Sequence, residues 1–252
     1  MPRKVLITGA SSGIGRDIAR YFDSLGCELI LVARREDRLR ALAGCMNGTP
    51  RIIPMDIGNA EKARALYEIT KDEKIDILIN NAGFGLWGSF TETDVEREVE
   101  MIRLNVEATH VLFKLFLKDF KARNSGKILN VASAAAFAPG PYMAAYYASK
   151  AYVLRLTESA AYELKAENSN VTVSALCPGP VDTEFNKVAG VHFSVKPLRS
   201  KYVAKYAVDN MILGKTVIVP GATIKLASIA AKIVPSSAAA GITAEIQKRK
   251  AK

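Results

Sequence analysis

Residues 8–15 read Thr8-Gly9-Ala10-Ser11-Ser12-Gly13-Ile14-Gly15, and they end an apolar segment that begins at Lys4. Their glycines predict a tight turn at Gly9, close approach of backbone to a phosphate at Gly13, and close packing of helix on strand at Gly15. A helix beginning near Ile14 directs free N–H groups and partial positive charge at such a phosphate. We therefore expect a dinucleotide pyrophosphate beside this turn, with Ser11, Ser12 and Ile14 among its contacts.

Strand-like and helix-like segments alternate from this turn onward, without a linker or a low-complexity tract. The strand-like segments are continuous Val/Ile/Leu runs, which are typical of parallel strands buried on both faces. We expect a single domain over 1–252 with a Rossmann-like, doubly wound parallel sheet of about seven strands, and one long helix over 94–123 that contains a break. The predicted strands are Lys4–Thr8, Glu28–Ala33, Arg51–Met55, Ile75–Asn80, Lys127–Val131, Val171–Leu176 and Thr216–Val219.

The composition of the chain is typical of a globular protein. The chain has 252 residues, 49% hydrophobic and 24% charged, which suits one large globular domain. No apolar run approaches the ~18 residues of a membrane span, and the apolar segment after Met1 is too short for a signal peptide. The three cysteines have no metal-type spacing, and their odd number argues against a disulfide framework. We expect a cytoplasmic protein without a metal site.

The net charge of +10 is unevenly distributed. Residues 1–184 carry equal numbers of basic and acidic side chains, so the whole excess lies in residues 185–252. Two interpretations stay open: a solvated basic surface, or a rim that attracts an anionic substrate. No nucleic-acid recognition motif accompanies the charge. For the apolar and basic tail over 222–252, we favour a core-covering or subunit-contact helix over an interfacial anchor and expect no membrane association.

Polar residues follow the predicted strands, where a doubly wound sheet binds its ligand. A carboxylate after the second strand would bind the adenosine ribose of NAD(H), but Arg34 and Arg35 stand there instead. Guanidinium groups suit the 2′-phosphate of NADP(H), although two solvated surface arginines remain the alternative. Further cofactor contacts are expected at the ends of strands three and four, from Asp56 and Ile57 toward the adenine and from Asn81-Ala82-Gly83 toward the ribose.

A second constellation lies past the middle of the chain. Tyr146 and Lys150 are four residues apart, so they are neighbours on a helix surface. A free phenol has a pKa near 10, and a nearby ammonium stabilises the phenolate and lowers that value. Ser133, after the fifth strand, is positioned to donate a hydrogen bond to a substrate oxygen. This pattern suits proton transfer to a carbonyl.

In order and spacing, these motifs resemble the short-chain dehydrogenase/reductase family of about 250 residues, along essentially the whole chain. The resemblance implies that Tyr146 is the general acid/base, that Ser133 orients the carbonyl, and that Lys150 binds the nicotinamide ribose and lowers the tyrosine pKa. It also implies that Asn105 holds a water for proton relay to Lys150. The segment that places the nicotinamide would be Pro178, Gly179, Val181 and Thr183.

The substrate is less defined. We expect a substrate lobe over 184–214, an apolar pocket with a basic rim, and packing rather than a pocket position for Tyr147. A ketone or aldehyde on a hydrophobic body with an anionic group fits, and hydroxysteroid or bile acid and 3-oxoacyl substrates both stay open. The family resemblance further implies a homodimer or homotetramer, and the competing function is a catalytically idle NADP(H)-binding regulator. The expected pocket residues, besides Ser133 and Tyr146, are Phe137, Tyr142, Met143 and Phe185.

Overall fold

Seven parallel strands form one sheet in the computed structural model of the chain, which describes residues 3–190, 197–231 and 233–248. The order across the sheet is β3-β2-β1-β4-β5-β6-β9. Chain order reverses between β1 and β4, which is where a doubly wound sheet opens its ligand crevice. The expected fold is confirmed. The strands are β1 Lys4–Thr8, β2 Glu28–Ala33, β3 Arg51–Pro54, β4 Ile77–Asn80, β5 Lys127–Val131, β6 Thr172–Leu176 and β9 Val217–Ile218.

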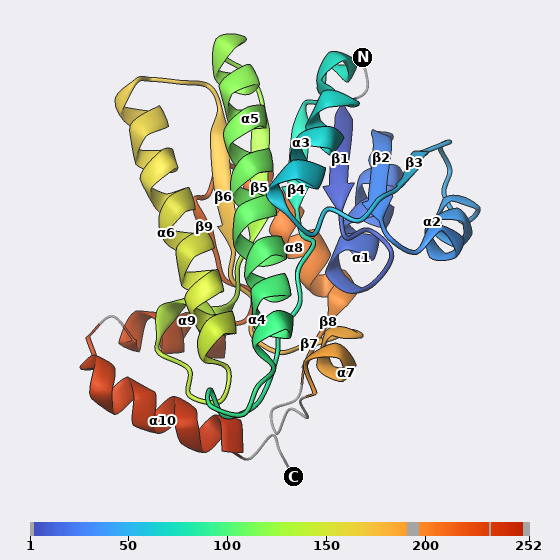
Figure 1. Ribbon diagram of the computed structural model, residues 1–252. Coiled ribbons are helices and arrows are strands. Elements are labelled where there is room, and N and C mark those ends of the chain that lie inside the picture. Colours follow the sequence, from blue (N-terminus) through green and yellow to red (C-terminus); the bar gives the residue numbers. More distant parts are fainter. Residues whose placement is uncertain (1–2, 191–196, 232, 249–252) are drawn as a thin grey trace.

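Helices cover both faces of the sheet and bury its apolar runs in two cores (Figure 1). One core contains Phe22, and the other contains Phe116 and Phe120. The first face is covered by α1 Gly13–Ser24, α2 Glu36–Ala43 and α8 Ser200–Ile212. The second face is covered by α3 Ala60–Glu68, followed by the 3-10 turn η1 Lys71–Glu73, and by α5 Thr109–Ala122 and α6 Ala144–Ala166.

The break expected in the long helix is a π-helical turn, η2 Arg103–Ala108, between α4 Val95–Ile102 and α5. Asp94 starts this long helix by accepting a hydrogen bond from the backbone N–H of Arg97. Asn105 lies in the π turn and is completely buried. Such turns often occur at functional sites, and this one places Asn105 beside the loop that follows β4.

The segment 184–214, expected to form the substrate lobe, is described except for residues 191–196. It contains α7 Phe185–Ala189 and the short strand β8 Leu198–Arg199, which pairs in parallel with β7 Val181–Asp182. The expected lobe residues Val191, Phe193 and Lys196 lie outside the described residues. Helix α8 packs instead on α1, and the hydroxyl of Ser200 donates to the buried carboxylate of Asp17. It therefore belongs to the layer that covers the sheet.

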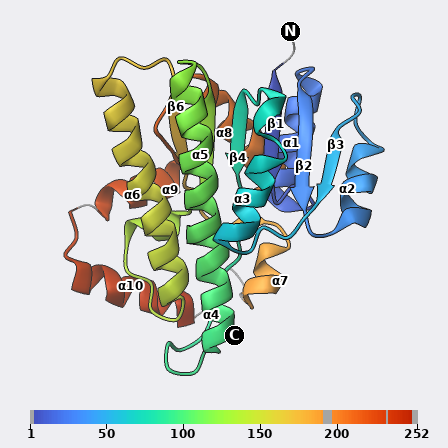
Figure 2. The same cartoon turned by 45° about the horizontal axis from the view of Figure 1, so that its top comes forward.

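The tail forms two helices, α9 Ala222–Ala230 and α10 Ser236–Lys248, which lie beside α6 on the side of the molecule away from α2 (Figures 1 and 2). Ile224 packs against the buried cluster around Val219, as a core-covering helix should. Leu226 and Ile229 of the same helix are exposed. Within the described ranges, no helix has the length and apolarity to cross a membrane. Lys232 and residues 249–252 lie outside those ranges.

Candidate active site

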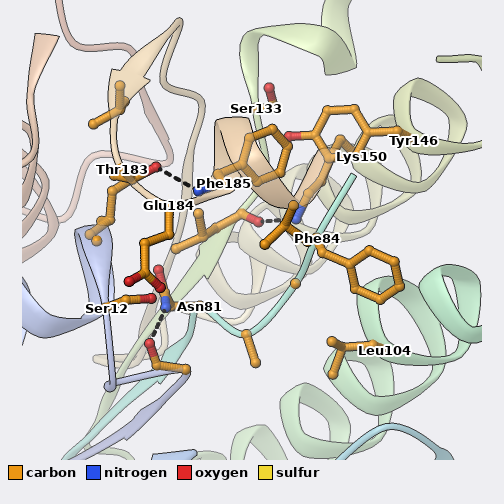
Figure 3. Close-up of a pocket in the computed structure, with 18 of the residues that line it drawn as sticks. Ser12, Asn81, Phe84, Leu104, Ser133, Tyr146, Lys150, Thr183, Glu184 and Phe185 are labelled. Carbon is orange, nitrogen blue, oxygen red and sulfur yellow. Dashed lines mark hydrogen bonds between the residues drawn. The ribbon is translucent and has the colours of Figure 1, made fainter. Parts of the chain in front are cut away.

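A cavity of about 420 Å³ opens along the carboxyl ends of the sheet strands. Four expected site residues, Gly15, Asn105, Phe137 and Tyr142, do not line it. The expected residues that do line it are Gly9, Ser11, Ser12, Gly13, Ile14, Arg34, Arg35, Asp56, Ile57, Asn81, Ala82, Gly83, Ser133, Met143, Tyr146, Lys150, Pro178, Gly179, Val181, Thr183 and Phe185. Figure 3 shows Ser12 and Asn81 toward one end of the cavity and Ser133, Tyr146 and Phe185 toward the other.

The glycine-rich turn has the backbone that its sequence predicts. Gly9 and Gly13 have φ values of +66° and +53°, a region that only glycine adopts without strain. Helix α1 begins at Gly13, and neither a side-chain cap nor an acidic first-turn residue occupies its N-terminus. Its first N–H groups and partial positive charge are therefore free to bind an anion in the cavity.

The turn is locked to the loop after β4 by hydrogen bonds. The hydroxyl of Thr8 accepts from the backbone N–H groups of Asn81 and Ala82 at 3.0 and 3.1 Å. In return, the Asn81 side-chain amide donates to the carbonyl oxygens of Thr8 and Gly9 at 3.0 and 3.1 Å. Asn81 therefore positions the phosphate turn in addition to its expected place under the adenine ribose.

Gly15 packs against these hydrogen-bonded groups of Asn81 and Gly9. A Cβ atom there would be 2.4 Å from Asn81 Nδ2 and 2.5 Å from the Gly9 carbonyl oxygen. We expect Gly15→Ala to lower the free energy of unfolding by about 1–3 kcal/mol through overpacking and to weaken dinucleotide binding, because the phosphate turn must shift. The matched control is Gly241→Ala in α10, where nothing lies within 4 Å of the added atom. The control should leave stability unchanged or raise it by up to about 1 kcal/mol. Thermal unfolding measures the stability of both variants. An unshifted unfolding midpoint for Gly15→Ala would contradict the packing argument.

The arginines after β2 differ in their partners. Arg35 donates from Nη1 to a Glu184 carboxylate oxygen at 2.9 Å and from Nη2 to Ser11 Oγ at 3.2 Å. Arg38 pairs with the other oxygen of the same carboxylate, and both arginines hold the pKa of Glu184 below its usual range. Arg34 is exposed at the cavity and helps to lower the pKa of Asp56. Arg34 is thus the guanidinium more available to a ligand.

Asp56, expected at the adenine, is held by its own loop. Its carboxylate accepts from Lys62 Nζ at 2.8 Å and from the backbone N–H of Gly58 at 3.2 Å. The Lys62 hydrogen bond is the main reason that the pKa of Asp56 lies below its ordinary value. The carboxylate is therefore ionised at neutral pH and able to accept from an amino group in the cavity.

Tyr146 and Ser133 face each other at the far end of the cavity (Figure 3). Ser133 Oγ accepts from the backbone N–H of Ala135 at 3.1 Å, which starts the 3-10 turn η3 Ala134–Phe137. Burial raises the pKa of Tyr146 to about 12, although the adjacent Ser133 hydroxyl lowers it. Lys150, which was expected to lower this pKa, is not among the groups that shift it, and burial is the dominant cause. At neutral pH the phenol carries its proton.

Lys150 is buried one helical turn from Tyr146. Its Nζ donates to the carbonyl oxygen of Val131 at 2.9 Å and lies 5.9 Å from the centre of the Tyr146 ring. Burial lowers the pKa of Lys150 to about 8. The ammonium therefore faces the cavity beside the strand β5 carbonyl rather than in contact with the phenol oxygen, as Figure 3 shows.

Asn105 contacts the loop after β4 instead of the cavity. Its Oδ1 accepts from the backbone N–H of Phe84 at 3.1 Å, and its Nδ2 donates to the Phe84 carbonyl at 2.9 Å and to Ser149 Oγ at 3.2 Å. This amide thereby joins the π turn, the Phe84 loop and α6. Its expected role in holding a relay water stays a prediction.

The expected nicotinamide segment also reaches the catalytic end. The Pro178 carbonyl accepts from the backbone N–H of Ala134, next to Ser133, at 2.8 Å. Thr183 Oγ1 accepts from the backbone N–H of Phe185 at 3.3 Å, and the Phe185 ring lies 5.4 Å from the Tyr146 ring. The segment therefore connects the phosphate end of the cavity to its reacting end.

The substrate wall differs from the expectation at two tyrosines. Tyr142 stacks on Trp87 outside the cavity, whereas Tyr147 lines it, which reverses their expected places. Phe137 packs on the cluster around Val219 instead. Gln247 from α10 also lines the cavity and was not expected. Helical spacing could have predicted that Tyr147 lines the cavity, because it shares one helix face with Met143, Tyr146 and Lys150. No comparable local pattern points to Gln247.

Fold and site together define a dinucleotide-binding oxidoreductase. The model of the short chain dehydrogenase family matches residues 3–191, and the chain belongs to this family. It is 32% identical to an uncharacterised oxidoreductase of Staphylococcus epidermidis over 84% of this chain and 90% of the relative. Within the described ranges, no cluster of His, Cys, Asp or Glu residues is suited to hold a metal ion.

Two further similar proteins have a known activity or ligand. A 7beta-hydroxysteroid dehydrogenase of Clostridium sardiniense is 30% identical over 71% of this chain and 69% of its own. A short-chain dehydrogenase from Sphingobium yanoikuyae, solved in complex with NADPH, superposes with a TM-score of 0.83. It shares 30% identity, with 92% of this chain and 94% of that one covered.

Proposed function

We propose that this oxidoreductase uses NADP(H) to interconvert a ketone or aldehyde and an alcohol on a hydrophobic substrate. One observation carries the proposal: the protonated, buried phenol of Tyr146 shares a cavity with an open helix N-terminus that suits a pyrophosphate. A reduced nicotinamide supplies hydride to the carbonyl carbon when bound. Tyr146 gives its phenol proton to the carbonyl oxygen, so the C=O double bond becomes a C–OH group and the phenolate remains.

The neighbouring residues support this proton transfer. The Ser133 hydroxyl donates a hydrogen bond to the substrate oxygen and so holds it at the phenol. Lys150 binds the nicotinamide ribose and stabilises the phenolate that the reaction leaves, because its ammonium faces the same cavity. Asn105 holds the Phe84 loop and the π turn in place and keeps a relay water near Lys150. Together these residues return a proton to Tyr146 after each turnover.

The preference for NADP(H) rests on the residues after β2. No carboxylate occupies the position that would bind the adenosine ribose hydroxyls, and Arg34 and Arg35 stand there at the cavity. A 2′-phosphate receives charge-assisted hydrogen bonds from guanidinium groups and would be repelled by a carboxylate. The cofactor loop thus favours the phosphorylated dinucleotide.

For the substrate, the apolar wall around Met143 and Phe185 favours a hydrophobic body. Arg97 lines the same cavity and supports an anionic group on the substrate. Hydroxysteroid or bile acid and 3-oxoacyl substrates both meet this description, and the hydroxysteroid dehydrogenase relative supports the first. We further propose a cytoplasmic homodimer or homotetramer without nucleic-acid partners, formed through the helices that carry Asn105 and Tyr146.

The test has two steps. In the first step the protein is titrated with NADPH and with NADH. Quenching of the Trp87 fluorescence reports the binding of each cofactor. NADPH consumption is then followed over a panel of steroid, cyclic and 3-oxoacyl ketones. Tighter NADPH binding with turnover of at least one ketone is expected. Binding without turnover across the panel would favour the idle regulator, and binding of neither cofactor would overturn the proposal.

A further inference from the structure

The last described helix returns to the cavity. Gln247 in α10 is completely buried, and its Nε2 donates to the phenol oxygen of Tyr147 at 2.5 Å. Thr243, one turn earlier, donates from Oγ1 to the carbonyl oxygen of Pro139 at 2.6 Å. These two contacts fix α10 across the end of the molecule that carries the start of α6 (Figure 1). A residue about 100 positions after Tyr147 thus becomes part of the same cavity wall.

Gln247 keeps an unused acceptor in that wall. Its Oε1 is buried and has no hydrogen-bond partner among the described residues. Buried polar atoms are nearly always hydrogen-bonded, since leaving one unpaired costs its desolvation without compensation. Gln247 lines the cavity, so a ligand in the cavity is the partner that the structure offers.

Tyr147 supplies the complementary donor. Its phenol oxygen accepts from Gln247 Nε2, so the phenol hydrogen is free to donate to another group. Burial raises the pKa of Tyr147 and keeps that hydrogen in place. An unpaired acceptor and a free donor therefore stand together in the wall, beside the apolar side chains of Met143 and Phe185.

We propose that Gln247 and Tyr147 bind a hydroxyl group of the substrate, remote from the reacting carbonyl. A hydroxyl donates to Gln247 Oε1 and accepts from the Tyr147 phenol at the same time, whereas a carboxylate would face the lone pairs of Oε1. The preferred substrate is accordingly a hydroxylated ketone with an apolar body. This inference rests on the proposed carbonyl reductase activity and narrows its substrate class.

The test compares ketones in matched pairs in which one hydroxyl is replaced by hydrogen or by a methyl group, with NADPH and the full chain. A long pair is 17β-hydroxy-5α-androstan-3-one and 5α-androstan-3-one, and a short pair is 4-hydroxycyclohexanone and 4-methylcyclohexanone. We expect kcat/KM of the hydroxylated ketone to exceed that of its partner by about tenfold or more in at least one pair, as one buried hydrogen-bond pair provides. Gln247→Leu and Tyr147→Phe should each reduce this ratio to about twofold or less, by lowering the value for the hydroxylated ketone alone.

Glu245→Leu is the matched control, because it also puts leucine in place of a polar residue on α10, but at an exposed position that does not line the cavity. It should keep the hydroxyl preference and the rate on both ketones. Equal ratios in the wild type and Gln247→Leu would overturn the hydroxyl site while leaving the reductase activity intact. Absence of turnover of every ketone by the wild type would instead overturn the proposed function, so the two failures are distinguishable.

Discussion

Replacement of Tyr146 by phenylalanine should lower kcat for carbonyl reduction by about 10³-fold, within the range of 10²–10⁴ that positioned acid catalysis contributes. The substitution removes only the phenol oxygen from a buried ring that also packs against Phe185. The cavity wall therefore keeps its shape while the proton donor is lost. NADPH affinity should change by less than about threefold, since the phosphate turn and the arginines after β2 are untouched.

Single-turnover kinetics and fluorescence titration separate these two effects. The matched control is Tyr162→Phe on the same helix, because Tyr162 is exposed and lies outside the cavity. It should retain the wild-type rate. Should Tyr146→Phe keep more than a tenth of the wild-type kcat, another group must supply the proton and the assignment of Tyr146 would be wrong.

Arg34→Asp should raise the NADPH dissociation constant by about 100-fold and leave NADH binding equal or tighter. A hydrogen bond to a charged group contributes about 1.5–3 kcal/mol, and the new carboxylate adds repulsion of the 2′-phosphate. The same carboxylate accepts hydrogen bonds from the ribose hydroxyls of NADH. Arg34 is exposed at the cavity, so the substitution should cost little stability.

Arg40→Asp makes the same charge change on α2 at a position that does not line the cavity, where Arg40 pairs with Glu36. It should leave the preference between NADPH and NADH unchanged. Titration of both variants with both cofactors tests the assignment. An unchanged preference in Arg34→Asp would refute the role of Arg34 in phosphate recognition.

Local sequence was enough to predict most of the cofactor end of the site. Glycine spacing determined the turn at Gly9 and Gly13 because only glycine adopts those positive φ values cheaply. The ends of parallel strands meet at one edge of a sheet, so Arg34, Asp56 and Asn81 were expected to lie together there, and the cavity contains all three. At this end of the site, strand topology alone places residues that are far apart in sequence side by side.

The substrate end depends on tertiary contacts that no local pattern reveals. The direction of Tyr142 follows from its positive φ of 66° and its stacking on Trp87, so it leaves the cavity to Tyr147. Gln247 reaches the site only because α10 folds back across α6. The pKa of Tyr146 likewise depends on burial, which the spacing of Tyr146 and Lys150 does not report.

Glu184 already forms ion pairs with Arg35 and Arg38. A cofactor phosphate at Arg35 would therefore have to compete with this carboxylate. Free inorganic anions compete poorly for guanidinium groups that are already neutralised nearby, whereas a dinucleotide anchored at the glycine-rich turn has a high effective concentration at Arg35. We therefore expect Glu184 to make Arg35 more selective for the phosphate of a whole dinucleotide than for free phosphate.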